Sequence, residues 1–154
     1  MKQRIYIDTS VVGGYFDEEF SEATVSFFES VKQGKVVILV SELLDKELIH
    51  APVHVRMLLE TIPSNCIERL TLVPEAKLLA SHYVEANVVG KTSLDDCQHI
   101  AMATICKADV LASWNFKHIV NLKRINGYNG INVLRGYKPI EIRTPKEIIS
   151  YEND

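Results

Sequence analysis

Four polar residues stand where a folded chain could assemble an acidic centre. Asp8 directly follows the apolar run 5–7, which has the β-branched and aromatic character of a strand buried on both faces. In open α/β sheets, ligands gather in the crevice beyond the carboxyl ends of the strands. The three residues that we expect to join Asp8 there are Glu47, Asp96 and Asn115.

Carboxylates are the ligands of hard cations such as Mg²⁺ and Mn²⁺. Three acids in one cleft repel each other, and a divalent ion relieves that repulsion. Such an ion polarises a phosphodiester oxygen and helps to generate hydroxide from bound water. The sequence therefore suggests a divalent-cation site at this edge of the sheet. The alternative for Asp8 is purely structural, because Asp8, Thr9 and Ser10 also form good turn and helix-cap chemistry.

Glu47 and its neighbours lie on a helix that Ser41 is expected to cap at the end of the strand 36–40. Glu47 lies four residues after Leu43, so it is predicted on the side that faces the core, where a carboxylate needs a partner. Glu42 is instead expected to form an exposed ion pair with Lys46.

Asp96 opens the most regularly patterned helix of the sequence. Ser93 and Asp96 resemble a capping box, and both Asp95 and Asp96 favour the positive end of a helix dipole, so a structural role competes with a functional one. His99 lies one turn after Asp96. It is expected either to orient Asp96 or touch a phosphate, or to be a satisfied core histidine.

The remaining pattern predicts strands alternating with helices, which is typical of a parallel sheet. Helices are expected over 18–33, 75–87, 93–108 and from 145 through 149, and strands over 5–7, 36–40, 67–73, 110–114 and 140–143. The glycines of the segment 121–139 predict a loop-rich stretch.

Size and composition suit one domain, 1–154. The 47% hydrophobic and 24% charged residues are those of an ordinary globular protein. We see neither an apolar run of about 20 residues that could span a bilayer nor a signal peptide. Three cysteines without metal-type spacing indicate reduced thiols and a cytoplasmic protein.

The charges are unevenly distributed along the chain. Residues 8–60 contain ten acidic side chains against four Lys and Arg, whereas residues 107–146 contain two against eight. The net charge of −3 does not favour RNA binding, but a polarised molecule can hold an acidic pocket beside a basic surface. The predicted phosphate contacts are Lys117, His118, Lys123 and Arg124, with Arg135 and Lys138 as further candidates. Tyr128 and Tyr137 either stack on bases or pack beneath the loop.

Four motifs in register resemble the PIN-domain nucleases, in particular the VapC-like toxins of bacterial toxin–antitoxin pairs. They cover about residues 4–120, and the remainder, 121–154, is expected to form a loop, a strand and a helix. The motifs are the strand ending in Asp8-Thr9-Ser10, the segment from Ser41 to Glu47, the helix Asp96 to Ala103 with its His-apolar-Ala run, and the strand and polar end from Leu111 to His118. One departure matters: many family members carry an aspartate where Asn115 stands.

The resemblance implies a three-layer α/β/α fold with a central, mainly parallel sheet. It further implies a Mg²⁺- or Mn²⁺-dependent endoribonuclease that leaves a 5′-phosphate and a 3′-hydroxyl. Asp8, Glu47, Asp96 and Asn115 would then be the metal-binding and catalytic residues, with Asn115 holding a metal-bound water or ligand through its amide. Ser10 or Thr9 would bond that water or the phosphate. The expected partners are RNA, a small antitoxin and a second copy of the chain.

Two other functions compete with this interpretation. One is a PIN-like module that binds RNA or protein without turnover, for which the neutral Asn115 is the motivating residue. The other is a different acid-based phosphohydrolase. That class would want a second aspartate two residues after Asp8, where Ser10 stands.

Overall fold

The computed structural model describes residues 2–90 and 93–152, with side chains through Ser150. Within them, a five-stranded sheet has the order β3-β2-β1-β4-β5, and every neighbouring pair is parallel. Its strands are β1 Gln3–Ile7, β2 Val36–Ser41, β3 Ile67–Leu70, β4 Val110–Ala112 and β5 Ile142–Arg143. The chain builds outward from β1 to one side and then returns to its other side. The order therefore reverses between β1 and β4, which is where open α/β sheets form their ligand crevice.

Strand alternation divides the core into two layers. Ile5 and Ile7 point to one face of the sheet, whereas Tyr6, between them, points to the other. All three side chains are fully buried, as the predicted strand with two covered faces requires.

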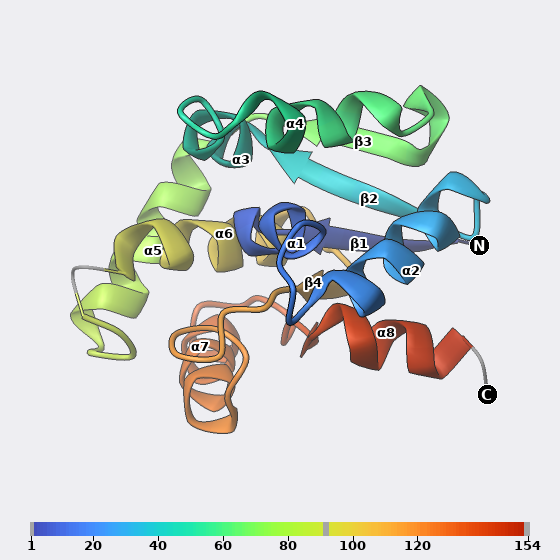
Figure 1. Ribbon diagram of the computed structural model, residues 1–154. Helices are drawn as coiled ribbons and strands as arrows, with labels where there is room; N and C mark the ends of the chain where they lie inside the picture. Colours follow the sequence, from blue (N-terminus) through green and yellow to red (C-terminus); the bar gives the residue numbers. More distant parts are fainter. Residues whose placement is uncertain (1, 91–92, 153–154) are drawn as a thin grey trace.

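Helices cover both faces, as Figure 1 shows. The layer on the Ile5 face includes α1 Thr9–Gly14, α2 Ser21–Lys32 and α8 Pro145–Glu152, with Phe27, Phe28 and Ile148 in its core. The other face is covered by α5 Pro74–Glu85, α6 Leu94–Ile105 and α7 Leu122–Leu134. The remaining helical segments are α3 Glu42–Glu47, α4 Val53–Arg56 and the 3₁₀ turns Met57–Thr61 and Ser64–Cys66. This arrangement confirms the three-layer fold.

The segment 121–139 corrects one prediction, because most of it is the helix α7 rather than a loop. Asn121 caps this helix by accepting a hydrogen bond from the backbone N–H of Arg124 at 2.9 Å. Gly127 is needed for packing and not for a turn: a Cβ there would lie 2.8 Å from a methyl group of Val88. Gly127 was therefore interpreted as a loop residue, although it lies inside α7 and allows this helix to pack closely against Val88.

Two further observations concern the chain as a whole. The thiols of Cys66, Cys97 and Cys106 are free, in line with the reduced state expected from their spacing. Within residues 2–90 and 93–152, no helix is both long and apolar enough to cross a membrane.

Candidate active site

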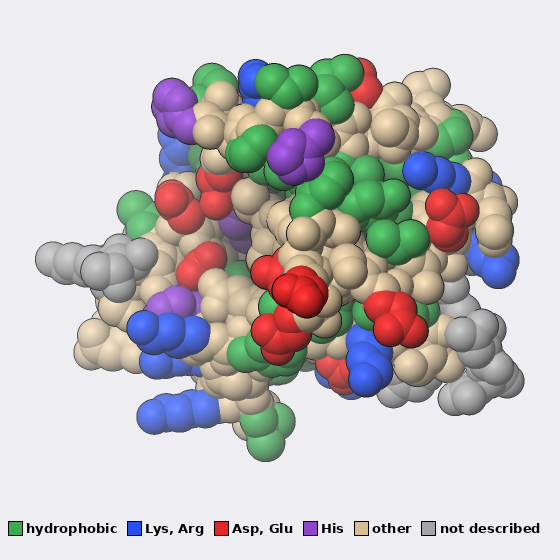
Figure 2. Space-filling view, viewed as in Figure 1, with side chains coloured by type: hydrophobic (Ala, Val, Ile, Leu, Met, Phe, Trp, Pro, Cys, Tyr) green, Lys and Arg blue, Asp and Glu red, His purple; other side chains and the backbone are tan. Residues whose placement is uncertain are grey.

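The carboxyl ends of three adjacent strands bring the predicted polar residues to one edge of the sheet. Asp8 directly follows β1, and Asn115 lies just beyond β4. Ser41 is the last residue of β2 and precedes α3, which ends at Glu47. Asp96 reaches the same edge from the first turn of α6. Figure 2 shows acidic and histidine side chains around a hollow on the left of the molecule, with Lys and Arg side chains below it.

Asp8 is buried, with 3% of its surface exposed, and two serine hydroxyls hold its carboxylate. Ser10 Oγ donates to Oδ1 and Ser113 Oγ donates to Oδ2, each at 2.6 Å. The Asp8 side chain makes no capping bond to α1, although Asp8 occupies the N-cap position. Capping of α1 therefore does not explain the carboxylate of Asp8, whose short hydrogen bonds are to the two serines.

The two serines also tie β1 to β4. Ser10 Oγ accepts the backbone N–H of Trp114 at 2.8 Å, and Ser113 Oγ accepts that of Asn115 at 3.0 Å. Ser113 was not among the residues predicted from the sequence. The available signal was its place at the end of β4, which corresponds to that of Ser41 at the end of β2.

Glu47 is held by a chain of hydrogen bonds that runs through the core. His99 Nε2 lies 2.5 Å from Glu47 Oε1, and His99 Nδ1 lies 2.7 Å from the hydroxyl of Tyr6. Tyr6 donates to Ser41 Oγ at 2.9 Å, so it accepts from His99 Nδ1–H. Ser41 in turn accepts the N–H of Leu43 at 3.2 Å, which confirms the predicted cap of α3.

These contacts revise the predictions for Glu47 and Glu42 and decide between the two alternatives for His99, which is a satisfied core histidine. The Glu47 side chain does not face the core; a third of it is exposed, and its partner His99 reaches it from inside. His99 is buried, and its direct contact is with Glu47 rather than with Asp96. Glu42 does not pair with Lys46 but accepts the backbone N–H of Leu72 at 2.6 Å.

Asp96 is positioned by Asn115 and not by a capping box. The Asn115 amide Nδ2 donates to Asp96 Oδ2 at 3.2 Å, and its Oδ1 accepts the backbone N–H of His118 at 3.0 Å. Ser93 makes no side-chain bond to the start of α6, and its buried hydroxyl has no partner in the described part of the chain. The structural role predicted for Ser93 with Asp96 is therefore wrong.

Burial and mutual charge shift the acids in different directions. Burial raises the pKa of Asp8 above its ordinary value, and the opposing effects of His99 and the two serines do not cancel it. The pKa of Asp96 is raised first by burial and then by the charge of Asp8. Burial also acts on Glu47, but the bond and charge of His99 outweigh it and lower the pKa of Glu47.

His99 shows the matching change. Its burial disfavours the charged ring, but Glu47, Asp8 and Asp96 together raise the pKa of His99. The imidazolium form, with both ring N–H groups donating, agrees with its bonds to Glu47 and Tyr6.

The oxygen atoms of Asp8, Thr9, Glu47 and Asp96 are the candidate ligands for a hard cation at this edge of the sheet. Across residues 2–90 and 93–152, no three His, Cys, Asp or Glu side chains form a ready-made metal cluster. Each oxygen of Asp8 nevertheless keeps acceptor capacity beyond its one hydroxyl bond, and Asp8 and Asp96 disfavour each other's charge. Thr9 lies close enough to Glu47 to lower its pKa, yet its buried Oγ1 forms no well-aligned hydrogen bond within the described residues. Carboxylate and hydroxyl oxygens are the kind of donor that hard cations such as Mg²⁺ and Mn²⁺ prefer.

The predicted phosphate-binding residues separate into two groups. Lys117 and Lys123 are exposed and His118 and Arg124 half-buried, all on the segment that leaves β4 for α7. By contrast, Lys138 lines a different cavity with Lys107 and Asp109, at the amino end of β4, and Arg135 is exposed at the far end of α7.

Neither tyrosine of this region is placed to stack on bases at the centre. Tyr128 is fully buried and donates to the carbonyl of His118 at 2.8 Å. The hydroxyl of Tyr137 donates to Glu75 at 2.5 Å, and Tyr137 lines the same cavity as Lys138. Tyr128 therefore takes the packing role that competed with stacking.

Solved structures with this fold were found, whereas no family model and no curated protein sequence matches the chain. A chain of the VapBC2 complex of Rickettsia felis is 14% identical with a TM-score of 0.59, covering 92% of this chain and 98% of that one. VapC20 of Mycobacterium tuberculosis, a toxin that cleaves the sarcin-ricin loop, is 12% identical with a TM-score of 0.56, covering 89% and 98%. A chain of FitAcB from Neisseria gonorrhoeae is 14% identical, also at 0.56, covering 92% and 97%. The chain therefore has the fold of VapC-like PIN-domain toxins, as its motifs predicted.

Proposed function

We propose that this chain, built on the fold of the VapC-like toxins, is a Mg²⁺- or Mn²⁺-dependent endoribonuclease that a small antitoxin neutralises. The observation that carries the proposal is the carboxylate of Asp8. It is buried at the point where the strand order reverses, fixed by two hydroxyls, and close enough to Asp96 to raise its pKa. Buried carboxylates whose pKa values are raised by burial and by each other cluster at functional sites, which supports a catalytic role for this edge of the sheet.

In this proposal the protein's part is to hold acidic oxygens around one point. Ser10 and Ser113 fix both oxygens of Asp8, and Asn115 fixes Asp96. Protonated His99 holds Glu47 and is itself oriented by Tyr6. A divalent cation bound there would polarise the phosphodiester and lower the pKa of a bound water.

Asn115 is assigned a positioning role in this scheme. Its amide nitrogen is bonded to Asp96 and its oxygen accepts a backbone N–H, so it orients an acid instead of adding charge. Of the two hydroxyls beside Asp8, Thr9 Oγ1 has no well-aligned partner among the described residues and is the one that would bond the phosphate or water, because Ser10 already donates its proton to Asp8.

No side-chain nucleophile is invoked. Cys97 is fully buried, and burial raises the pKa of its thiol to about 12. Burial also raises the pKa of Cys106. Since the thiolate is the reactive form, these cysteines are inert near neutral pH.

The similar structures support the proposed partner. VapBC2 was solved bound to a DNA fragment from its promoter, and FitAB was solved bound to the IR36 DNA fragment. By analogy with these complexes, we propose that this chain binds an antitoxin and that the substrate of the chain is RNA. Homodimer formation and a cytoplasmic location stay predictions from the sequence.

One observation favours a second candidate, a PIN-fold module that binds RNA or protein without cleaving it. Asn115 places a neutral amide where many members of the family carry an acid, and the structure commits that amide to Asp96. The phosphatase alternative has no comparable support, because Ser10 binds Asp8 where that class would need a second acid.

Cleavage of labelled single-stranded RNA with Mn²⁺ or with EDTA tests the proposal. We expect Mn²⁺-dependent cleavage that Asp8→Asn lowers by about 100-fold or more, because the variant removes the central charge. Asp17→Asn, at an exposed carboxylate outside the centre, is the control and should cleave like the wild type. Equal cleavage by the wild type and Asp8→Asn, or none by either, would overturn the nuclease and favour the binding module.

A further inference from the structure

A cavity of about 410 Å³ opens beside Glu47. Its volume lies within the range of about 300–1,000 Å³ that is usual for small-molecule sites. The residues that line it come from α3, the end of β3, α5 and α6: Leu43, Lys46, Glu47, Leu72, Lys77, Asp95 and Gln98. Glu47 thus belongs both to this cavity and to the acidic centre.

Two lysines that line the cavity, Lys46 and Lys77, have no ion-pair or hydrogen-bond partner among the described side chains. Glu42, the expected partner of Lys46, is instead bonded to the backbone of Leu72. Lys46 and Lys77 are exposed, and neither forms an ion pair or side-chain hydrogen bond within the described residues. Free ammonium groups of this kind supply contacts to phosphate oxygens.

The rest of the lining suits a nucleobase. Leu43 is buried and Leu72 half-buried, so they offer an apolar surface for the face of a base. Asp95 accepts hydrogen bonds, and Gln98 both donates and accepts them. Guanine matches this set best, because its N1–H and N2–H₂ donors suit a carboxylate and its O6 suits an amide N–H.

The order of the strands sets the direction of a bound RNA. Lys46 and Leu72 follow β2 and β3, which lie on one side of β1, whereas the basic segment 117–124 follows β4 on the other side. Asp8, at the end of β1, lies between them. A strand that contacts both flanks therefore passes over the acidic centre.

We propose that this cavity is a nucleotide subsite that binds the guanosine next to the cleaved phosphodiester, with Lys46 and Lys77 on its phosphates and Asp95 and Gln98 on its base edge. The assignment rests on the proposed ribonuclease function. It adds to that function the residues that choose the cleavage site.

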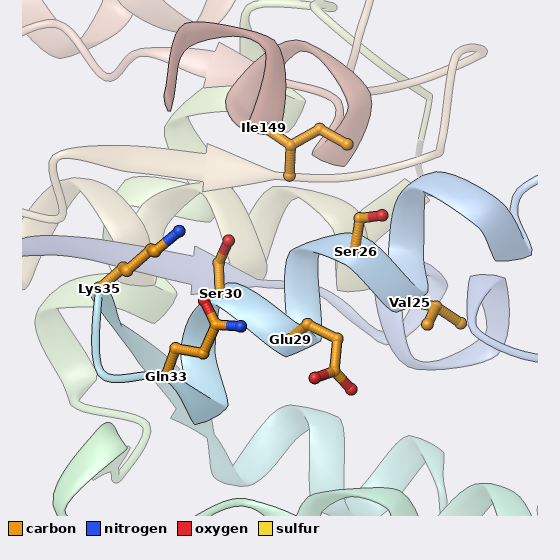
Figure 3. A pocket seen from close by; sticks show the side chains of 7 residues that line it. All are labelled: Val25, Ser26, Glu29, Ser30, Gln33, Lys35 and Ile149. Carbon is orange, nitrogen blue, oxygen red and sulfur yellow. The ribbon is translucent and has the colours of Figure 1, made fainter. Parts of the chain in front are cut away.

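Binding measured without cleavage tests the subsite separately from catalysis. In the Asp8→Asn background, we compare the Kd for short randomised single-stranded RNA of Lys46→Gln/Lys77→Gln with that of Lys35→Gln/Lys107→Gln. The control removes the same charge from exposed lysines that precede β2 and β4 and so lie at the opposite edge of the sheet. Lys35 lines a separate hollow of about 280 Å³ between α2 and α8 (Figure 3).

We expect Lys46→Gln/Lys77→Gln to weaken binding by about tenfold and to reduce the salt slope by about 1.4, which is twice the 0.7 of one phosphate contact on a single strand. The control should change neither value. Sequencing the RNA retained by the Asp8→Asn protein should show enriched guanine, and Asp95→Asn should abolish this enrichment.

The outcomes separate the two proposals. If both double variants bind alike, or if the retained RNA shows no enriched guanine, the subsite is wrong even where Mn²⁺-dependent cleavage is found. If wild-type protein cleaves no RNA but the binding and enrichment results hold, the nuclease is wrong while the nucleotide site stands.

Discussion

At the scale of single residues, the centre is built from acids whose charge the fold disfavours. Burial removes the carboxylate of Asp8 from water and raises its pKa. The hydrogen bonds from Ser10 and Ser113 lower that pKa, but not back to its ordinary value. Among the acids of the centre, and within the described residues, Glu47 alone forms an ion pair, with His99. A metal-free centre therefore carries a free-energy cost at neutral pH, which is common where function needs preorganised charge.

The first prediction concerns the pH dependence of this cost. A carboxyl whose pKa is raised by folding binds its proton more tightly in the folded state. Its favourable contribution is complete below the unfolded pKa of about 3.9 and is lost as the pH rises through the folded value. Asp8→Asn should therefore gain stability over the metal-free wild type as the pH rises from about 4 to about 7, by up to about 1.4 kcal/mol per pH unit.

Urea unfolding of both proteins in EDTA across this range gives the difference. Asp17→Asn, at an exposed carboxylate, should show a difference that is nearly constant with pH. The raised pKa of His99 contributes stability that is lost only above its ordinary value of 6.5, so this histidine contributes little to the change over most of the range. A pH-independent difference for Asp8→Asn would show that burial of its charge is not costly.

At the scale of elements, α1 and the end of β4 close on each other through Gly14 and Trp114. A Cβ on Gly14 would lie 2.7 Å from two atoms of the Trp114 indole, whose Nε1–H donates to Thr24 at 2.9 Å. Phe20 stacks on the same indole, with ring centroids 4.4 Å apart. This contact holds the backbone of Trp114 where its N–H reaches Ser10, the residue that fixes Asp8.

The second prediction compares the two adjacent glycines of α1. Gly14→Ala should destabilise the protein by about 1–3 kcal/mol, because the indole is rigid and packed. Gly13→Ala is the matched control, since nothing lies within 4 Å of its added Cβ. It should stabilise the helix by about 0.4–1 kcal/mol by reducing the entropy of the unfolded chain. Chemical denaturation of both variants decides the matter, and similar values for the two would refute the close contact at Gly14.

At the scale of the whole molecule, charge is distributed by position in the sheet. Asp8, Glu42 and Glu47 follow the ends of β1 and β2, and the basic segment 117–124 follows β4 at the same edge of the sheet. A protein with a net charge of −3 can therefore present a local cationic surface next to its acidic centre.

The third prediction assigns RNA affinity to that local surface. Lys117→Gln/Lys123→Gln should weaken binding to single-stranded RNA by about tenfold at low salt and lower the salt slope, because both side chains are exposed beside β4. Lys35→Gln/Lys107→Gln again serves as the charge-matched control. Fluorescence anisotropy at several salt concentrations measures both quantities, and equal slopes for the two pairs would rule out this surface as the RNA contact.

The sequence by itself determined the strands, most helices and the sheet edge at which Asp8, Glu47, Asp96 and Asn115 gather. Apolar runs such as 5–7 and 36–40 and helical stripes are local patterns, and parallel topology places every strand end at one edge. The helix α7 was not predicted, because Gly127 was interpreted as a loop residue. Its actual role is a close contact with Val88, which is distant in the sequence.

Only the tertiary structure decided which side chains meet. Hydrogen bonds from Ser113 to Asp8, from His99 to Glu47 and from Asn115 to Asp96 join residues from different elements. The same is true of the pKa shifts, since burial and neighbouring charges are properties of three-dimensional packing and not of spacing along the chain. Local sequence patterns therefore determine the helices and strands, whereas contacts between distant parts of the chain determine the hydrogen-bond partners of each acid.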